Sequence, residues 1–269
     1  MCYDISFTVD LPELRAHFPD LVMDENIQLN LEAAEHILGP GFHGEHAILY
    51  RNRTDHLVHL RLHEWGVIPF YINTPDKIND FKKSRNGFLN VRAERILDDK
   101  TSYWFKIRER RCLIPVTGII EHREVVGFKN SIPYLVWPCS QKIFFLPGLY
   151  SVAAVPDQET GELIERRTFA LITRPANELM KKIHNSGANR WRMPLFLPLE
   201  LSQTWLNNTL TETEYRRILN YEIPAEDLAY RTTFSVRGNK LRPDGLSKIA
   251  PYSWNEPPLG TADPIPKTK

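Results

Sequence analysis

The chain has 269 residues, 42% of them hydrophobic and 25% charged, a composition typical of a globular protein with one large domain or two small ones. Its 34 basic and 33 acidic residues give a formal net charge of +1, so nucleic-acid binding would have to come from a local patch. The cysteines, Cys2, Cys112 and Cys139, lack CxxC spacing, which argues against a disulfide framework and a thiolate zinc site. The chain has no apolar run long enough to cross a membrane and no signal-peptide pattern at its start, so we expect a cytoplasmic protein.

The N-terminal third mixes helical and extended signals. Residues 11–18 follow a candidate N-cap, and the apolar residues of 27–38 have near-helical spacing, so both segments are expected to be helices. Alternating apolar residues between 47 and 71 predict extended structure. A short helix is expected at 76–83, directly after a proline.

The middle of the chain is rich in strand signals, and helices return after it. Short apolar or β-branched runs between prolines and glycines predict strands at 112–120, 134–137, 143–146 and 168–173. Helical spacing predicts helices at 176–183, 199–206 and 211–219. The tail is proline-rich, so we expect residues 1–230 to form one domain, with 231–269 as an extended segment packed on it.

Position 2 carries the most informative residue. Cysteine is small enough for a preceding methionine to be removed, which would leave Cys2 with a free α-amine and a thiol on adjacent carbons. Their reference pKa values are about 7.7–8.0 and about 8.5, so both groups are partly nucleophilic at neutral pH. Together they can close a five-membered ring on one aldehyde carbon. A cysteine at this position is also commonly incidental, so the remaining residues must decide.

Three further segments carry candidate chemistry. Residues 90–95 combine an amide with guanidinium groups that can hold a hydroxyl or a phosphate, although alternating charges are also typical of a solvated face. An apolar strand ends at Glu121, where burial can raise the pKa of a carboxyl; a salt bridge to Arg123 is the alternative. A later helix ends at His184, a position that suits a general acid and equally an ordinary helix end.

A group of histidines suggests a metal site at first sight: His43, His46, His56, His59 and His63. On a helix, three of them would share one face. The segment 56–63 is expected to be a strand, however, where His56 and His59 point to opposite faces. We therefore expect no metal and no cofactor.

Five motifs occur in order along the chain: Met1-Cys2, Trp65-Gly-Val-Ile-Pro69, Asn90-Val-Arg92-Ala-Glu94, Arg110-Arg-Cys-Leu-Ile-Pro115 through Gly118 to Glu121, and Ile183-His184 with Arg192-Met-Pro194. This combination resembles the SRAP family, the SOS-response-associated peptidases, also called abasic-site processing proteins. The resemblance runs from residue 2 to about residue 206. It implies an α+β fold with a strongly bent, mostly antiparallel sheet or an open β-barrel and flanking helices.

The resemblance also implies a function in the SOS and DNA-damage response. Members bind single-stranded DNA that contains an abasic site and link to it covalently. The α-amine of Cys2 would form a Schiff base with the C1′ aldehyde of the opened sugar, and the thiol would then close a thiazolidine. The expected partner is single-stranded DNA with abasic sites. We expect the protein to be a monomer that associates with the nucleoid when DNA is damaged.

Matching the motifs residue by residue assigns roles to side chains of this chain. Asn90 would hold the terminal residue and the sugar, Glu121 would move protons at the amine, and His184 would act as general acid–base on the sugar oxygen. The residues expected to contact DNA are Arg92, Thr173, Arg192, Arg190, Trp65 and Arg111.

Three positions depart from the family's pattern. The family usually continues Cys-Gly-Arg-Phe, whereas Tyr3 and Asp4 follow here, and the Asp4 carboxylate would repel a phosphate. His122 replaces the aromatic residue that commonly follows the catalytic glutamate. Residues 186–191 are an insertion ahead of Arg192. The insertion could supply Arg190 and Trp191 as replacement contacts, or it could move Arg192 out of reach of the DNA.

Two other functions stay open at this point. The chain could be a cysteine peptidase that uses Cys2 and His184 on peptides in trans. It could also be a non-catalytic binder of single-stranded DNA that uses the basic clusters at 108–111 and 82–85. Blocking the α-amine of Cys2 with an N-terminal extension separates them, because only the crosslinking enzyme needs that amine.

Overall fold

The protein was analysed as a computed structural model, which describes residues 2–7, 11–23, 36–38, 45–157, 159–238 and 240–264. The strands are β1 (Asp4–Phe7), β2 (Val22–Met23), β3 (His36–Leu38), β4 (Glu45–Arg51), β5 (Val58–Trp65), β6 (Asn90–Arg92), β7 (Arg111–Val116), β8 (Gly118–Arg123), β9 (Ile132–Pro138), β10 (Phe144–Pro156), β11 (Leu163–Pro175), β12 (Arg192–Pro194) and β13 (Leu228–Thr232). The α-helices are α1 (Leu11–His17), α3 (Pro75–Ser84), α4 (Ala93–Leu97), α5 (Tyr103–Lys106), α6 (Glu178–Ile183), α7 (Leu199–Trp205) and α8 (Glu212–Leu219). The described residues also form two short 3₁₀ helices, η1 (Arg85–Phe88) and η2 (Ala225–Asp227).

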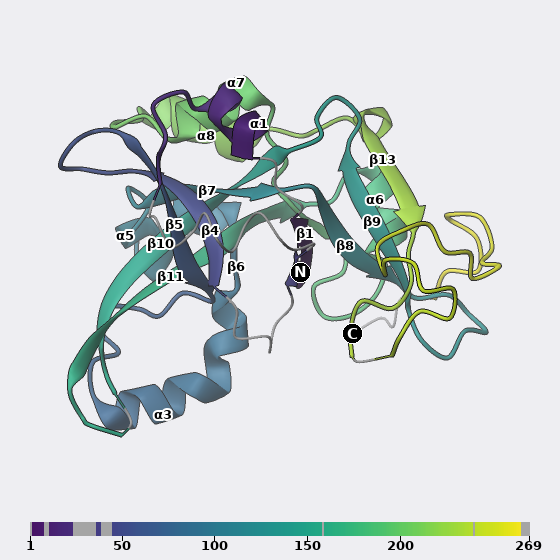
Figure 1. Cartoon of the computed structure of the whole chain (residues 1–269), viewed down its shortest axis with the longest axis horizontal. Helices are drawn as coiled ribbons and strands as arrows, with labels where there is room; N and C mark the ends of the chain where they lie inside the picture. Colours follow the sequence, from purple (N-terminus) through teal and green to yellow (C-terminus); the bar gives the residue numbers. More distant parts are fainter. Residues whose placement is uncertain are drawn as a thin grey trace.

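The larger sheet closes on itself. Its strand order is β12-β11-β10-β7-β4-β5-β2, and β11 also pairs in parallel with β5, through Thr168–Glu64 and Phe169–Trp65. The β11–β5 pairing joins β5, β4, β7, β10 and β11 into a barrel, with the long β10–β11 hairpin extending beyond it (Figure 1). The expected α+β fold is confirmed, and the barrel is closed, because β11 is long enough to reach β5 as well as β10.

The barrel wall packs tightly enough to require a glycine. At Gly148 on β10, a Cβ atom would lie 2.6 Å from the carbonyl oxygen of Ala170 and 2.6 Å from the Ile114 side chain. A larger residue there would push the neighbouring strands apart. On one side of the barrel, α7 and α8 bury Trp205 and Tyr215 in the largest apolar core, which stabilises the helices through apolar contact.

A smaller sheet positions the start of the chain. Its order is β13-β9-β8-β1-β3, with β1 between β8 and β3. The antiparallel register pairs Asp4 with Ile120, so continuing it places Cys2 and Tyr3 beside the end of β8. That end carries Glu121.

Most elements expected from the sequence are present, with two differences. Residues 36–38, expected at the end of a helix, form strand β3 instead, because their backbone pairs with β1; residues 24–35 lie outside the described part of the chain. The run 112–120 divides at Thr117 into β7 and β8. The Thr117 backbone N–H donates to the Ser6 carbonyl, which turns the chain from one sheet to the other.

The segment after β13 lies against β8 and β9 (Figure 1). Thr233 and Pro251 form an antiparallel bridge, and the Trp254 indole N–H donates to the Thr233 carbonyl. The fully buried guanidinium of Arg123 donates to main-chain carbonyls of this segment and to the carboxylate of Asp263. None of the described helices has the length and apolar character to cross a membrane.

Candidate functional site

Cys2 is held at the centre of the candidate site. Its side chain is fully buried, and its Sγ donates to the Asp4 carbonyl oxygen at 3.4 Å. The side-chain amide of Asn90 donates to the Cys2 carbonyl oxygen at 2.9 Å. Asn90 reaches this position because β6 pairs in parallel with β11. Its Oδ1 is buried and accepts no hydrogen bond from a described residue.

Glu121 is a buried carboxylate beside Cys2. The side chain is 3% exposed, and its Oε1 has no hydrogen-bond partner among the described residues. The salt bridge to Arg123 that the sequence left open does not form, since Arg123 is directed into the C-terminal segment. A buried acceptor without a donor is costly, so this oxygen is suited to a cation or a donor that arrives from elsewhere.

The surroundings of Cys2 keep its thiol protonated. Burial raises the pKa of the Cys2 thiol well above its usual value, and the nearby carboxylates of Glu121 and Asp4 raise it further. The thiol therefore remains neutral at physiological pH until a reacting group changes its surroundings.

His184 is presented by a well-capped helix. Asn177 caps α6 by accepting from the Met180 N–H at 3.0 Å, and His184 is the C-cap residue. Its Nδ1 lies 2.7 Å from the main-chain carbonyl of Arg192, which can only accept, so Nδ1 carries the proton and donates. In the neutral ring the basic lone pair is then on Nε2. Helix α6 packs against β8, which brings His184 to the strand that carries Glu121.

Three of the expected DNA contacts meet at the end of β11. Thr173 pairs with Arg92 on β6 and with Pro194 on β12. The Arg192 guanidinium donates to the Thr173 carbonyl at 2.8 Å and to both oxygens of Glu94, at 2.7 and 3.1 Å. Burial opposes ionisation of Glu94, but the hydrogen bonds and charge of Arg192 outweigh it and lower the pKa. The insertion 186–191 therefore leaves Arg192 in this cluster.

Asp4 is neutralised within the fold. Its side chain is 2% exposed, and its Oδ2 accepts from Arg237 Nε at 3.0 Å and Nη2 at 2.6 Å. The expected repulsion of phosphate by Asp4 is thus offset by a guanidinium from the C-terminal segment. Arg237 also acts on His122, whose pKa is lowered to about 4 by burial first and then by the charges of Arg237 and His184.

The remaining aromatic and basic candidates have separate environments. Trp65 is half-buried, stacks on Phe169 at a ring distance of 6.1 Å, and donates from its indole N–H to the Leu89 carbonyl. Arg190 lies over the exposed ring of Trp191, with its guanidinium carbon 4.6 Å from the ring centroid. This pair forms a solvent-facing part of the insertion.

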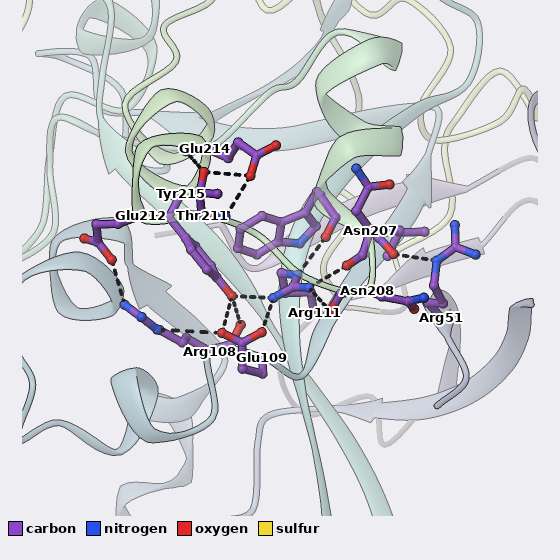
Figure 2. A network of polar contacts seen from close by, with 12 residues as sticks. Arg51, Arg108, Glu109, Arg111, Asn207, Asn208, Thr211, Glu212, Glu214 and Tyr215 are labelled. Carbon is purple, nitrogen blue, oxygen red and sulfur yellow. Dashed lines mark hydrogen bonds and ion pairs between the residues drawn. The ribbon is translucent and has the colours of Figure 1, made fainter. Parts of the chain in front are cut away.

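Arg111 does not join the cluster around Cys2. Its guanidinium is buried beneath α7 and α8 and donates to Glu109, Tyr215 and the main-chain carbonyls of Trp205, Asn207 and Asn208 (Figure 2). These bonds occupy its donors, so in this conformation Arg111 offers none to a phosphate. Its motif position did not reveal this, because periodicity does not say which buried partners a side chain meets.

The described members of the histidine group lie in different environments. His59 and His63 are buried on β5, with His59 bonded to Asp55, whereas His56 lies in a turn with a positive φ of 62°. Among the described residues, no group of histidine, cysteine and acidic side chains has a metal-binding arrangement. His43 lies outside the described residues.

Sequence reasoning missed residues that the tertiary structure brings to the site. Arg237 binds Asp4, and Asp263 joins Arg123 to Asn185, the neighbour of His184. Neither Arg237 nor Asp263 lies in a motif, and no local pattern indicates their partners.

Comparisons with known proteins identify the family of this chain and several relatives. The family model described as SOS response associated peptidase (SRAP) matches residues 1–235. The chain is 30% identical over 179 residues to the abasic site processing protein YoqW of Bacillus subtilis (strain 168), covering 65% of this chain and 70% of that protein. It is 28% identical over 179 residues to the abasic site processing protein YoaM of the same organism, covering 65% of this chain and 69% of that protein.

Solved structures share the fold. A protein from Bacteroides thetaiotaomicron superposes with a TM-score of 0.70 at 26% identity, covering 86% of this chain and 92% of that chain. A protein from Bordetella bronchiseptica gives a TM-score of 0.66 at 19% identity, covering 86% of this chain and 99% of that chain, a likeness that concerns the fold alone. Because the family model matches residues 1–235, this protein belongs to the SOS response associated peptidase family.

Proposed function

We propose that this protein processes abasic sites in single-stranded DNA by forming a covalent thiazolidine link through Cys2, once the residue before Cys2 is removed. The observation that carries the proposal is Glu121, a buried carboxylate beside Cys2 whose Oε1 has no partner among the described residues. A freed α-amine of Cys2 is a cation when protonated, which is the group such a carboxylate would accommodate. The relatives named as abasic site processing proteins support the same substrate.

The reaction balances with a single loss of water. The neutral α-amine adds to the C1′ aldehyde of the opened sugar, and the carbinolamine expels water to give an imine. The Cys2 sulfur then adds to C1′, while the thiol proton moves to the imine nitrogen, closing the ring. Glu121 accepts the proton that the ammonium loses before attack. The raised pKa of the thiol keeps sulfur from reacting before the imine forms.

The surrounding residues supply position and protons. Asn90 holds the Cys2 carbonyl, so the amine and thiol keep one orientation relative to the incoming aldehyde. His184, with its proton fixed on Nδ1, has Nε2 to exchange a proton with the sugar oxygen during ring opening. Arg92, Thr173 and Arg192 form a polar edge at the end of β11 for a flanking phosphate.

A cysteine peptidase acting in trans is less well supported. Such an enzyme needs a thiolate, which a neighbouring imidazolium stabilises by lowering the cysteine pKa. Here burial, Glu121 and Asp4 raise the pKa of Cys2. This environment favours a reaction in which the amine attacks first and the sulfur second.

Intact-protein mass spectrometry tests the proposal. Untagged protein is incubated with a single-stranded oligonucleotide that contains one abasic site. We expect an adduct whose mass is the sum of both reactants less one water, absent with Cys2→Ala, with undamaged DNA and with an N-terminal extension ahead of Cys2. Cys139→Ala, which removes the exposed thiol, is the matched control and should react normally. Loss of the preceding residue without an adduct would overturn the proposal.

A further inference from the structure

The segment beyond the family match brings a guanidinium to the Cys2 site. The family model ends at residue 235, and Arg237 follows it in the chain. Its backbone is held in place: the Ser235 hydroxyl donates to the Arg237 carbonyl at 3.3 Å, and the Lys248 ammonium donates to the Gly238 carbonyl at 2.8 Å. These hydrogen bonds hold the main chain at Arg237 and Gly238 in place, and so fix the position from which the Arg237 side chain extends.

One edge of this guanidinium is bound to the protein, and the other faces outward. Nε and Nη2 both donate to Oδ2 of Asp4, at 3.0 and 2.6 Å. Nη1 donates to no acceptor in the described part of the chain, and half of the side chain is exposed, at 50%. Because a guanidinium presents donors along two separate edges, it can bind a carboxylate and a phosphate together.

The ion pair of Asp4 and Arg237 lies close to Cys2. Asp4 follows Cys2 by two positions, and its carbonyl oxygen accepts from the Cys2 thiol. The Arg237 guanidinium carbon also lies 6.0 Å from the ring centroid of Tyr3, the residue between Cys2 and Asp4. In DNA, phosphates flank every sugar, so a strand whose abasic sugar reaches Cys2 brings a phosphate close to this outer edge.

Resting on the function proposed above, we propose that Arg237 is a substrate-binding residue, which contacts the phosphate next to the abasic sugar while it holds Asp4. The C-terminal segment thus supplies the cation at the place where Asp4 introduces a negative charge. A competing role is purely structural: Arg237 would only neutralise a buried carboxylate.

The test uses the full chain and a probe that cannot react. Fluorescence anisotropy measures the Kd for a single-stranded oligonucleotide with a tetrahydrofuran abasic analogue, which has no aldehyde, over a series of salt concentrations. We expect Arg237→Gln to raise the Kd roughly 5- to 10-fold. The number of phosphate contacts, obtained from the slope of log Kd against log salt concentration, should fall by about one. Arg217→Gln, an equal loss of charge at an exposed position of α8, should leave both quantities unchanged.

A double variant separates the two roles. Arg237→Gln leaves Asp4 unpaired, so the additional change Asp4→Asn removes the uncompensated charge and restores the thermal stability. If Arg237 contacts DNA, Asp4→Asn alone binds more tightly than the wild type. The double variant Asp4→Asn/Arg237→Gln binds more weakly than the wild type, although more tightly than Arg237→Gln, because the repulsion by Asp4 is gone but the phosphate contact is still missing. Wild-type affinity and salt dependence in the double variant would overturn the proposal.

The covalent reaction is scored separately with a genuine abasic oligonucleotide. If the wild type forms no adduct but the anisotropy differences are present, the thiazolidine chemistry is wrong and the Arg237 contact stands. If the wild type forms the adduct and Arg237→Gln binds the analogue like Arg217→Gln, the chemistry stands and the Arg237 contact is wrong.

Discussion

Asn90 and Cys2 are 88 residues apart in the sequence, and the Asn90 side-chain amide donates to the Cys2 carbonyl oxygen at 2.9 Å. This bond fixes the main chain of the residue that carries both proposed nucleophiles. Since Asn90 lies on β6, which pairs with β11 of the barrel, this bond connects the start of the chain to the barrel.

Replacing Asn90 tests the value of this bond for the reaction. Asn90→Ala removes the donor to Cys2, and Asn90→Asp replaces it with a charge that repels the carbonyl. We expect the rate of adduct formation to fall roughly 10- to 100-fold at saturating DNA, because misplacement of reacting groups by about 1 Å has effects of that size. Quenched time courses on gels give the rate. Asn73→Ala, at an exposed loop position, is the control, and an equal loss there would contradict the argument.

Glu121→Gln should change the titration of Cys2. Burial is the main cause of the raised thiol pKa, and the Glu121 charge adds to it, so neutralising Glu121 lowers this pKa without restoring the ordinary value. The pH profile of iodoacetamide alkylation at Cys2, followed by peptide mass spectrometry, should therefore move to lower pH. Glu124→Gln, exposed on the same segment, should leave the profile in place. An unmoved profile in Glu121→Gln would mean that the carboxylate does not act on Cys2.

Glu94→Gln should strengthen DNA binding. Glu94 accepts from Arg192 through both carboxylate oxygens and so neutralises a guanidinium expected to face phosphate. Removing the carboxylate charge leaves Arg192 net positive, and we expect the Kd for single-stranded DNA to fall about 3- to 10-fold at low salt. Anisotropy titrations measure this. Glu178→Gln removes an exposed carboxylate on α6 and should have a smaller effect. Weaker binding by Glu94→Gln would show that the ion pair positions Arg192.

Arg111→Met should lower stability rather than chemistry. Arg111 is buried, and its donors are bonded to Glu109, Tyr215 and main-chain carbonyls. Removing it leaves those partners unsatisfied, for a loss of about 3–5 kcal/mol in the free energy of unfolding. Urea denaturation measures the loss, with the exposed Arg53→Met as control. Loss of DNA affinity at unchanged stability would instead support the DNA contact expected from the sequence.

Because of His122, the free energy of unfolding should decrease at acidic pH. Its pKa is lowered to about 4 in the folded protein, whereas an unfolded histidine titrates near about 6.5. Between these two pKa values the unfolded chain binds more protons than the folded protein. The free energy of unfolding is therefore highest above pH of about 6.5 and falls as the pH is lowered toward 4. The fall is at most about 1.4 kcal/mol per pH unit. Urea midpoints across this range should vary less with pH in His122→Phe. His56→Asn, in an exposed turn, should keep the wild-type dependence.

Local patterns predicted much of the fold. Prolines and glycines divided the apolar runs into strands, and helical spacing located α6, α7 and α8 to within a few residues. The helix expected over 27–38 was wrong where it can be compared, at residues 36–38. Pairing with β1 determines the conformation there, and a strand partner is not visible in local spacing.

The order of five motifs, anchored by Cys2, determined the family and the residues proposed to react, because each motif records a local chemical requirement. Only the tertiary structure decided how distant charges pair. Asp4 meets Arg237 across 233 residues and Arg123 meets Asp263 across 140, while Arg111 bonds to partners beneath the helices and not to residues around Cys2. Such pairings depend on which surfaces the closed barrel and the C-terminal segment bring together. Sequence periodicity specifies the faces and ends of elements but not the partners that those faces meet.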